Sequence, residues 1–454
     1  MSGKLIIANA TVVNEKQIYA ADIIIENGLI SQIIKKGSKP QQSSGSVTFS
    51  EVIDAAGLYV FPGCIDDQVH FREPGLTHKA DIFTESRAAV AGGITSYMDM
   101  PNTKPPVLTQ KALEEKYAIA AEKSLANYSF YMGASNDNFD EVCKTNPDEV
   151  CGLKIFMGSS TGNMLVDDIE ILKKLFALKQ LLIATHCEDE NIIQKKTAQY
   201  KKKYGQHVPI ECHPEIRSRE ACYESTLKAV NLAKEYGTRL HVLHLSTAEE
   251  LSLFSSEKLT HHKRITAEVC VHHLVFNSDD YQTHGRLIKW NPAIKEKRDQ
   301  RALLDAINNN TIDVIATDHA PHSYIEKQQP YFDASSGGPM VQHALVAMLE
   351  MYHQNKISLE TIVDKMCHAP AICYRIQNRG FIREGYHADL TIVDLNDPWE
   401  VSPQNILYKC GWTPLMGKIF KSRVTHTIVN GNLAYQRGEF LNTQPGQRLL
   451  FNTL

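Results

Sequence analysis

Residues 66–75 read DDQVHFREPG and come shortly after an apolar run, Leu58–Phe61, and the turn signal Pro62-Gly63. Carboxylates, an imidazole and a guanidinium therefore leave a buried strand close together. Because alternate side chains of a strand share a face, His70 and Arg72 are predicted to point the same way. The stretch predicts a functional site at the end of that strand, and a solvated loop with an incidental histidine is the alternative.

Short apolar runs alternate with helical patterns through the centre of the chain. We predict strands at Ile65–His70, Ile94–Met100, Tyr128–Met132, Gly152–Met157, Leu181–His186, Leu240–His244, Ile265–Val271 and Val314–Thr317. We predict helices at Thr109–Lys123, Asp167–Lys179, Arg219–Glu235 and Lys297–Asn309. Strands that alternate with helices in this way predict an α/β fold, a (β/α)8 TIM-type barrel. An open doubly wound sheet is the alternative, but the glycine-rich dinucleotide loop that normally follows its first strand is missing.

The two chain ends share a different pattern. Ala21–Ile25 is followed by the hairpin signal Asn27-Gly28, and Thr425–Val429 is followed by Asn430-Gly431. We predict a small β-sandwich domain built from both termini, residues 1–57 and 380–454, with the barrel at residues 58–379. The polar segment Lys36–Ser50 predicts a loop.

Composition limits the class of partner. The chain has 48 Lys and Arg against 52 Asp and Glu, a net charge of -4, which gives no reason to expect nucleic acid or an anionic membrane as partner. Its 10 cysteines form no Cys-x-x-Cys pair, as expected of reduced thiols. Its first residues, MSGKLIIANATVV, lack the features of a signal peptide, and there is no run of about 18 apolar residues, so we expect neither secretion nor a membrane span. We expect a cytoplasmic homodimer that acts on a small-molecule substrate.

Chemically capable side chains collect where the predicted strands end. They are His70 with Arg72 (first strand), Asn102 (second), Lys154 (fourth), His186 (fifth), His244 (sixth) and Asp318 with His322 (eighth). In a TIM-type barrel the site is built at the C-terminal ends of several strands, so these side chains are predicted to converge. The imidazoles and Asp318 offer nitrogen and oxygen ligands suited to zinc or a similar divalent ion.

Lys154 lies in an apolar strand, Cys151–Met157. Burial disfavours the ammonium form and lowers the pKa of a lysine, which leaves a neutral amine. One interpretation is an amine that adds carbon dioxide and becomes a carbamate, whose oxygens can bridge metals. The other is a lysine whose charged end reaches solvent at the end of the strand.

The chain resembles the amidohydrolase superfamily, and within it the dihydroorotases of the long-chain type. The matching motifs, in order, are PGCIDDQVHFREPG, MPNT, GLKIFMG, ATHCEDE, HVLHLST, KWNPAIK, TDHAPH and TPLMGK. The resemblance covers nearly the whole chain. It implies a metal-dependent cyclic amidase of pyrimidine synthesis that interconverts N-carbamoyl-L-aspartate and L-dihydroorotate.

The resemblance also implies roles for single residues. Zinc, one or two ions per chain, is expected to be held by His70, carboxylated Lys154, His186, His244 and Asp318, with Asp318 as general base and then acid. Arg72, Asn102 and His322 are expected to bind the substrate carboxylate. Asn291, Gly337 and Gly338 are expected to contact the ring amide, with a simple turn before Pro292 as the equal alternative for Asn291.

One residue departs from the family pattern. The family has His-x-His after its first strand, and this chain has Gln68-Val69-His70. A glutamine oxygen is a weaker zinc ligand than imidazole, so the more exposed of two expected metals is in doubt. Strand alternation puts Asp66, and not Asp67, on the face of His70 as a replacement ligand.

Three hypotheses about function follow. The first is an active dihydroorotase. The second is another cyclic amidase, such as a hydantoinase, dihydropyrimidinase or allantoinase, against which Arg72 and His322 argue. The third is a non-catalytic subunit that scaffolds a partner such as aspartate transcarbamoylase, supported by Gln68 alone.

Overall fold

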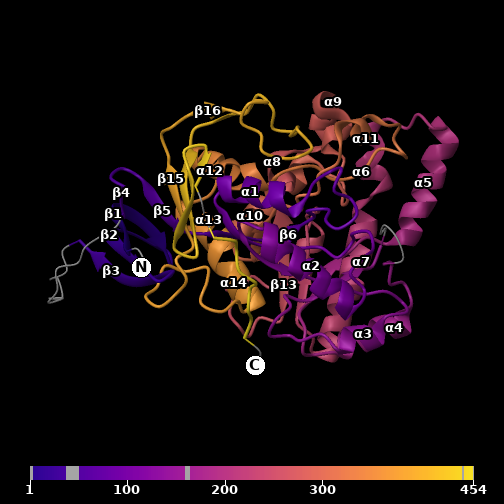
Figure 1. The fold of residues 1–454 in the computed structure, drawn as a ribbon. Coiled ribbons are helices and arrows are strands. Elements are labelled where there is room, and N and C mark those ends of the chain that lie inside the picture. The colour runs from indigo at the N-terminus through magenta and orange to yellow at the C-terminus, as the bar shows by residue number, and fades with distance from the viewer. Residues whose placement is uncertain (1–3, 37–50, 159–163, 442–443, 453–454) are drawn as a thin grey trace.

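The structure is a computed structural model that describes residues 4–36, 51–158, 164–441 and 444–452 (Figure 1). The loop predicted at Lys36–Ser50 lies outside these residues from position 37 onward. Two bodies are visible in Figure 1: a sheet that carries both the indigo N-terminal strands and the yellow C-terminal strands, and a larger unit of strands and helices beside it. The α/β fold class is confirmed.

Eight successive parallel strand positions form the barrel, and each was predicted to within a few residues. The strands are β6 (Cys64–Val69), β7 (Ile94–Asp99), β8 (Asn127–Phe130) continuing as β9 (Met132–Gly133), β10 (Leu153–Phe156), β11 (Ile183–His186), β12 (Leu240–Val242), β13 (Ile265–Cys270) and β14 (Val314–Ala316). They pair in the orders β6-β7-β8 and β9-β10-β11-β12-β13-β14. The ring closes where Val69 bridges His319 and the His70 N–H donates to the His319 carbonyl at 2.7 Å.

Helices follow most barrel strands. They are α1 (Ile82–Ala91), α2 (Gln110–Lys123), α3 (Phe139–Cys143), α4 (Ile169–Ala177), α5 (Glu190–Tyr204), α6 (His213–Ile216), α7 (Arg219–Tyr236), α8 (Val271–Val275), α9 (Tyr281–His284), α10 (Lys297–Asn308), α11 (Tyr324–Gln328), α12 (Ala344–His353), α13 (Leu359–Val363) and α14 (Ala369–Tyr374). The four predicted helices correspond to α2, α4, α7 and α10. Their starts follow from side-chain caps; Ser218, for example, accepts a hydrogen bond from Ala221 N at the start of α7.

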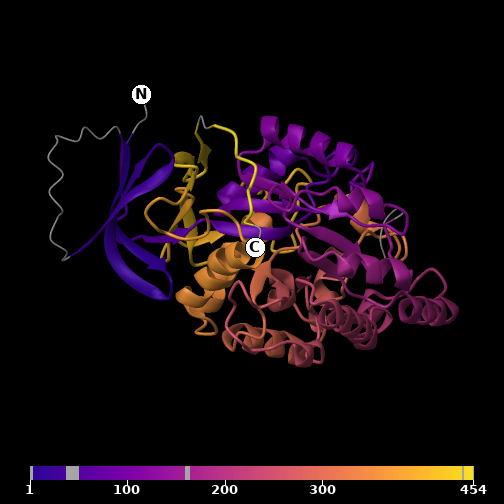
Figure 2. The ribbon, with the colours of Figure 1, turned by 90° about the horizontal axis from the view of Figure 1, so that it is seen from below.

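Both chain ends contribute to one mainly antiparallel sheet. Its strands are β1 (Lys4–Asn14), β2 (Gln17–Glu26), β3 (Leu29–Lys35), β4 (Glu51–Asp54), β5 (Tyr59–Pro62), β15 (Leu390–Asp394), β18 (Arg423–Val429), β19 (Asn432–Gln436) and β20 (Glu439–Phe440). A short pair, β16 (Trp399–Glu400) and β17 (Ile419–Phe420), lies outside it. Figure 2 shows the indigo strands beside the yellow ones from below. The domain ranges stay predictions; β5 belongs to this sheet although it lies past residue 57.

The two predicted hairpin turns, one from each end of the chain, pack against each other. Asn27, Gly28, Asn430 and Gly431 all have positive φ, which two-residue turns of this twist require. The turns also touch each other: a Cβ at Gly28 would stand 2.9 Å from the Asn430 carbonyl oxygen. Glycine at 28 therefore allows both the turn and the close approach. In the described part of the chain, no helix is long and apolar enough to cross a membrane.

Candidate active site

An irregularity in β6 sets the direction of the DDQVHFREPG side chains. The pairing of β6 with β7 shifts register between Asp66 and Val69. Asp66 turns to Thr317, accepting hydrogen bonds from its backbone N–H (3.2 Å) and its hydroxyl (2.5 Å). The expectation that Asp66 faces the site beside His70 is therefore wrong, because a register shift breaks the simple alternation on which it depended.

One cavity of about 600 Å³ opens at the C-terminal ends of the barrel strands. Its walls include Gln68, His70, Arg72, Asn102, Lys154, His186, His244, Asn291, Asp318, His322 and Gly337. The structure thus brings together all but one of the predicted site residues. Gly338 is the exception: it packs under Trp290, where a Cβ would stand 2.7 Å from the indole ring, so its role is packing and not wall.

Two histidines face each other within the cavity. His186 Nδ1 lies 3.0 Å from His244 Nε2, and both side chains are buried. The other ring nitrogen of His186 contacts Glu188 Oε2 at 3.0 Å, which fixes the ring. Burial would raise the pKa of Glu188, but Arg217 and His186 hold it at about 2, so the carboxylate stays charged.

These histidines fit a divalent ion. Burial lowers the pKa of both His186 and His244, which favours the neutral, metal-binding form. His244 Nδ1 is buried without a hydrogen-bond partner, so this nitrogen is also open to a further ligand. Two imidazole nitrogens that converge within 3.0 Å are a donor set suited to zinc once the proton they share is released.

Asp318 lies at the centre of the next group. His70 Nε2 is 3.1 Å from Asp318 Oδ1, and Gln68 Nε2 donates to the same oxygen at 3.2 Å. Burial raises the pKa of Asp318 to about 7, against the opposing effect of the Lys154 ammonium. A carboxyl group with a pKa near neutrality can accept and return a proton at physiological pH.

Lys154 is 1% exposed and lies in β10, which pairs with β9 on one side and β11 on the other. Burial lowers its pKa to about 8, so the neutral amine is far more populated near neutral pH than in an ordinary lysine. Its Nζ lies 4.6 Å from the centre of the Phe156 ring. The end of the side chain is held in the cavity wall, which argues against the alternative of a lysine that reaches solvent.

Arg72 is held rigidly at the rim. Its Nε donates to the Pro321 carbonyl at 3.0 Å, and its Nη2 lies 2.9 Å from His322 Nε2. Lys79 Nζ lies 3.0 Å from His322 Nδ1. Burial, with Arg72 and Lys79 next, lowers the pKa of His322, so the imidazole is neutral and accepts from a neighbouring cation.

Backbone strain collects at the same place. Arg72, His244 and Asp318 have φ angles of 67°, 40° and 44°, in the left-handed region that side chains with a Cβ rarely adopt. Strained residues of this kind persist where the surrounding structure holds them, and they gather at functional sites.

Sequence reasoning missed several wall residues. Lys289 and Arg217 line the cavity but had no assigned role, and neither had Glu188, which contacts His186 from behind the wall. Lys289 opens the KWNPAIK motif and Glu188 lies in ATHCEDE. Lys289 is buried and donates to the carbonyls of Tyr331 and Ala334, both at 2.6 Å. The sequence did show that Lys289 stands in a motif typical of the family, but nothing in the sequence distinguishes this lysine from one on the surface.

Comparison with known proteins shows the family to which this chain belongs. The sequence model of the amidohydrolase family matches residues 59–434. The chain belongs to the amidohydrolase family. A dihydroorotase of Carboxydothermus hydrogenoformans is 32% identical over 434 residues, which cover 94% of this chain and 97% of that protein. A dihydroorotase of Methanosphaera stadtmanae is 30% identical, over 95% of this chain and 96% of its own.

Solved structures give a second view of this amidohydrolase. An L-hydantoinase (dihydropyrimidinase) from Arthrobacter aurescens superposes with a TM-score of 0.91 at 26% identity, over 99% of this chain and 100% of that one. Sequence relatives and structural neighbours thus differ in substrate, although both kinds act on cyclic amides. The chain is a cyclic amide hydrolase.

Proposed function

We propose that this amidohydrolase is a dihydroorotase, which interconverts N-carbamoyl-L-aspartate and L-dihydroorotate with loss or gain of water. The observation that carries the proposal is the state of Arg72. This guanidinium is 7% exposed, lines the cavity, and has no carboxylate within 4.0 Å among the described residues. A buried cation without an anion is costly, and a substrate carboxylate at this position would complete the pair.

Other groups in the cavity support an acidic substrate. Lys289 is bonded only to backbone carbonyls in the hydrogen bonds seen for it, and burial lowers its pKa to about 7. Asn291 Oδ1 is buried without a hydrogen-bond partner, so it is free to accept from a ring N–H. Asn102 Oδ1 lies 2.8 Å from His70 Nδ1, and this contact orients the imidazole so that its other nitrogen faces Asp318.

We assign the proton transfers to Asp318. In the hydrolytic direction, Asp318 takes a proton from the attacking water and returns it to the ring nitrogen as the amide C–N bond breaks. Arg72 and His322 hold the carboxylate and thereby fix the ring carbon near Asp318. The chemistry that a bound divalent ion supplies here is activation of water and polarisation of a carbonyl group.

We propose His186, His244, His70, Asp318 and carboxylated Lys154 as the residues that hold zinc. The neutral Lys154 amine would add carbon dioxide and release one proton, which yields a carbamate with two ligand oxygens. Support comes from the depressed pKa and from the position of Lys154 in the wall of the same cavity. The homodimer and the cytoplasmic location stay predictions.

The competing activity is that of a hydantoinase, favoured by the structural similarity to the Arthrobacter enzyme. The ring substrates of that activity lack the carboxylate that Arg72 would bind. A steady-state assay of the purified chain with dihydroorotate, dihydrouracil, hydantoin and allantoin separates the two. We expect kcat/KM to be highest for dihydroorotate; a preference for hydantoin or dihydrouracil would overturn the proposal.

The same assay tests the third hypothesis, a non-catalytic subunit. Inactivity towards every substrate, in protein that carries its metal, would favour a scaffold. The structure argues for activity, because Lys154, His186, His244 and Asp318 all line one cavity with perturbed pKa values.

A further inference from the structure

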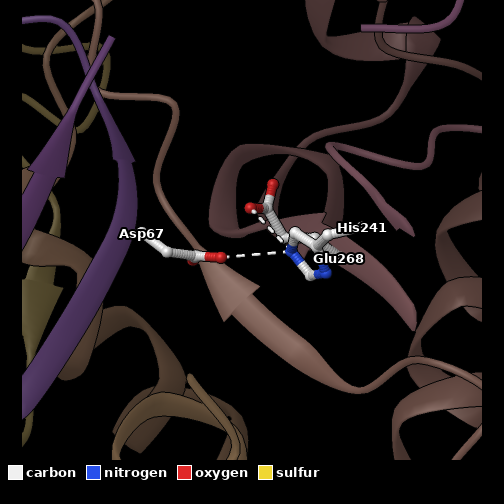
Figure 3. A group of neighbouring side chains, drawn as sticks. All are labelled: Asp67, His241 and Glu268. Carbon is white, nitrogen blue, oxygen red and sulfur yellow. Dashed lines mark ion pairs between the residues drawn. The ribbon is translucent and has the colours of Figure 1, made fainter. Parts of the chain in front are cut away.

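Three buried side chains inside the barrel form a cluster that the proposed reaction does not use. Asp67 comes from β6, His241 from β12 and Glu268 from β13, and Figure 3 shows them pointing toward one another. Because β6 and β12 are not neighbours in the sheet order, Asp67 and His241 meet across the interior of the barrel. None of the three lines the cavity at the mouth.

The polar atoms of this cluster lack partners. All three residues are 0% exposed. Both Asp67 carboxylate oxygens, His241 Nε2 and Glu268 Oε2 have no hydrogen-bond partner. His241 Nε2 is 3.1 Å from Asp67 Oδ2, yet its N–H is not directed at that oxygen, so no hydrogen bond forms. Buried polar atoms are normally paired, so this group needs a further occupant.

The charge of the cluster points the same way. Across the part of the chain that the structure describes, His241 is the one basic side chain within 4.0 Å of either carboxylate. A protonated imidazole would neutralise one carboxylate, and the other would have to take up a proton or stay charged without compensation. A divalent cation would neutralise both.

The spacing fits one ion. Two ligand atoms held by one ion at about 2.1 Å lie roughly 3.0–3.5 Å apart, in octahedral or tetrahedral coordination. His241 Nε2 lies 3.1 Å from Asp67 Oδ2 and 3.6 Å from Glu268 Oε2. The three ligand atoms all lie within 4.8 Å of one another. Both carboxylate oxygens lie beside His241 Nε2, away from the direction in which this nitrogen would donate a hydrogen bond. An ion in that direction would have the two oxygens as its neighbouring ligands.

We propose that Asp67, His241 and Glu268 form a cation site inside the barrel, distinct from the site at the mouth, which binds a divalent first-row transition ion such as zinc. One imidazole and two carboxylates are borderline ligands that suit such ions better than Mg²⁺ or Ca²⁺. His241 is oriented by Thr266, whose hydroxyl lies 2.8 Å from Nδ1 and leaves Nε2 as the ligand atom.

The interior site would stabilise the mouth. Glu268 Oε1 accepts from the His244 backbone N–H at 2.9 Å, at a residue with a strained φ of 40°. Asp67 directly precedes Gln68 in the chain. An ion that fixes Asp67 and Glu268 therefore fixes the backbone beneath Gln68 and His244. This proposal is independent of the substrate of the enzyme.

The test is direct and uses the full chain. Crystals grown with zinc chloride near neutral pH are measured above and below the zinc absorption edge. We expect an anomalous difference peak between the three side chains, separate from any peak at His186 and His244. A map without a peak among Asp67, His241 and Glu268 overturns the proposal.

Metal content of variants gives a second measurement. Asp67→Asn should lower bound zinc by one ion per chain, whereas Asp66→Asn, a change at the neighbouring buried carboxylate bonded to Thr317, should leave it unchanged. Folding of both variants is checked by their melting temperatures. Equal zinc content in both variants and in the unchanged protein would show that Asp67 is not a ligand.

Discussion

Gln68 Nε2 donates a 3.2 Å hydrogen bond to Asp318 Oδ1, the oxygen that His70 Nε2 also approaches at 3.1 Å. Gln68 Oε1 in turn lies 3.6 Å from the Cys270 thiol. Gln68, which stands where the resemblance leads us to expect a histidine, is therefore engaged with the carboxylate that we propose for proton transfer. It can orient Asp318, but it offers no nitrogen lone pair to a metal.

The first prediction concerns the number of ions at the mouth. We expect the unchanged protein to bind one zinc ion tightly there, through Lys154, His186 and His244, and to remain active. Gln68→His should raise occupancy toward two ions at the mouth and leave the tight one unchanged, because imidazole restores a strong ligand. Anomalous difference maps locate the ions and keep them apart from the interior site. Two tightly held ions at the mouth of the unchanged protein would contradict this expectation.

Substrate recognition gives the second prediction. Arg72→Met should raise KM for dihydroorotate roughly 30–150-fold, since a lost charge-assisted bidentate contact costs about 2–3 kcal/mol. The Pro321 and His322 contacts hold the guanidinium in place, so most of this loss should come from the substrate. Dihydrouracil, which has no carboxylate, is the control and should be affected far less. Equal losses on both substrates would mean that Arg72 supports the site without binding the carboxylate.

Lysine carboxylation gives the third prediction. Lys154→Ala should lose zinc from the mouth and lose activity, because both carbamate oxygens disappear. Added short carboxylic acids should restore part of the activity, since a free carboxylate can occupy the space of the carbamate. Activity is measured with and without acetate and propionate at fixed ionic strength. A Lys154→Ala enzyme as active as the unchanged one would exclude the carbamate as a ligand.

Much of this architecture could be predicted from sequence because its signals are local. The barrel strands are short apolar runs, and the hairpins at Asn27-Gly28 and Asn430-Gly431 need residues that accept positive φ. The convergence of Lys154, His186 and Asp318 on one cavity follows from the rule that barrel sites lie at the C-terminal strand ends. Strand order then fixes the site without further information.

The remainder depends on contacts that sequence does not encode locally. The shift in β6 that turns Asp66 to Thr317 involves residues 251 positions apart, and no pattern around Asp66 indicates it. Strand alternation predicted only that Asp67 points away from the face of His70, and its meeting with His241 and Glu268 is a property of the closed barrel. The resemblance predicted Gly338, with Gly337, as a binding residue, but only the structure shows that Gly338 packs against Trp290 and Gly337 alone lines the cavity.

The last prediction concerns stability in acid, and it depends on a histidine that does not line the cavity. His343 is 0% exposed, lies 2.9 Å from the Tyr408 hydroxyl through Nδ1, and stacks against Trp399 and Phe420. Burial lowers its pKa to about 3, from a value near 6.5 in the unfolded chain. Between about pH 3 and pH 6.5, the unfolded state therefore binds a proton at this histidine that the folded state does not.

The sign follows from proton linkage. Stability is unaffected by His343 above the unfolded pKa and falls as pH drops from about 6.5 toward 3, by up to roughly 1.4 kcal/mol per pH unit. His343→Gln removes this titration, so its stability should fall less steeply with acid even if lost packing makes it less stable at neutral pH. Urea unfolding at several pH values from about 7.5 to 5 measures the slope. His261→Gln, a change at an exposed histidine, is the control and should keep the slope of the unchanged protein. An identical slope in His343→Gln would show that His343 does not contribute to the acid sensitivity of this fold.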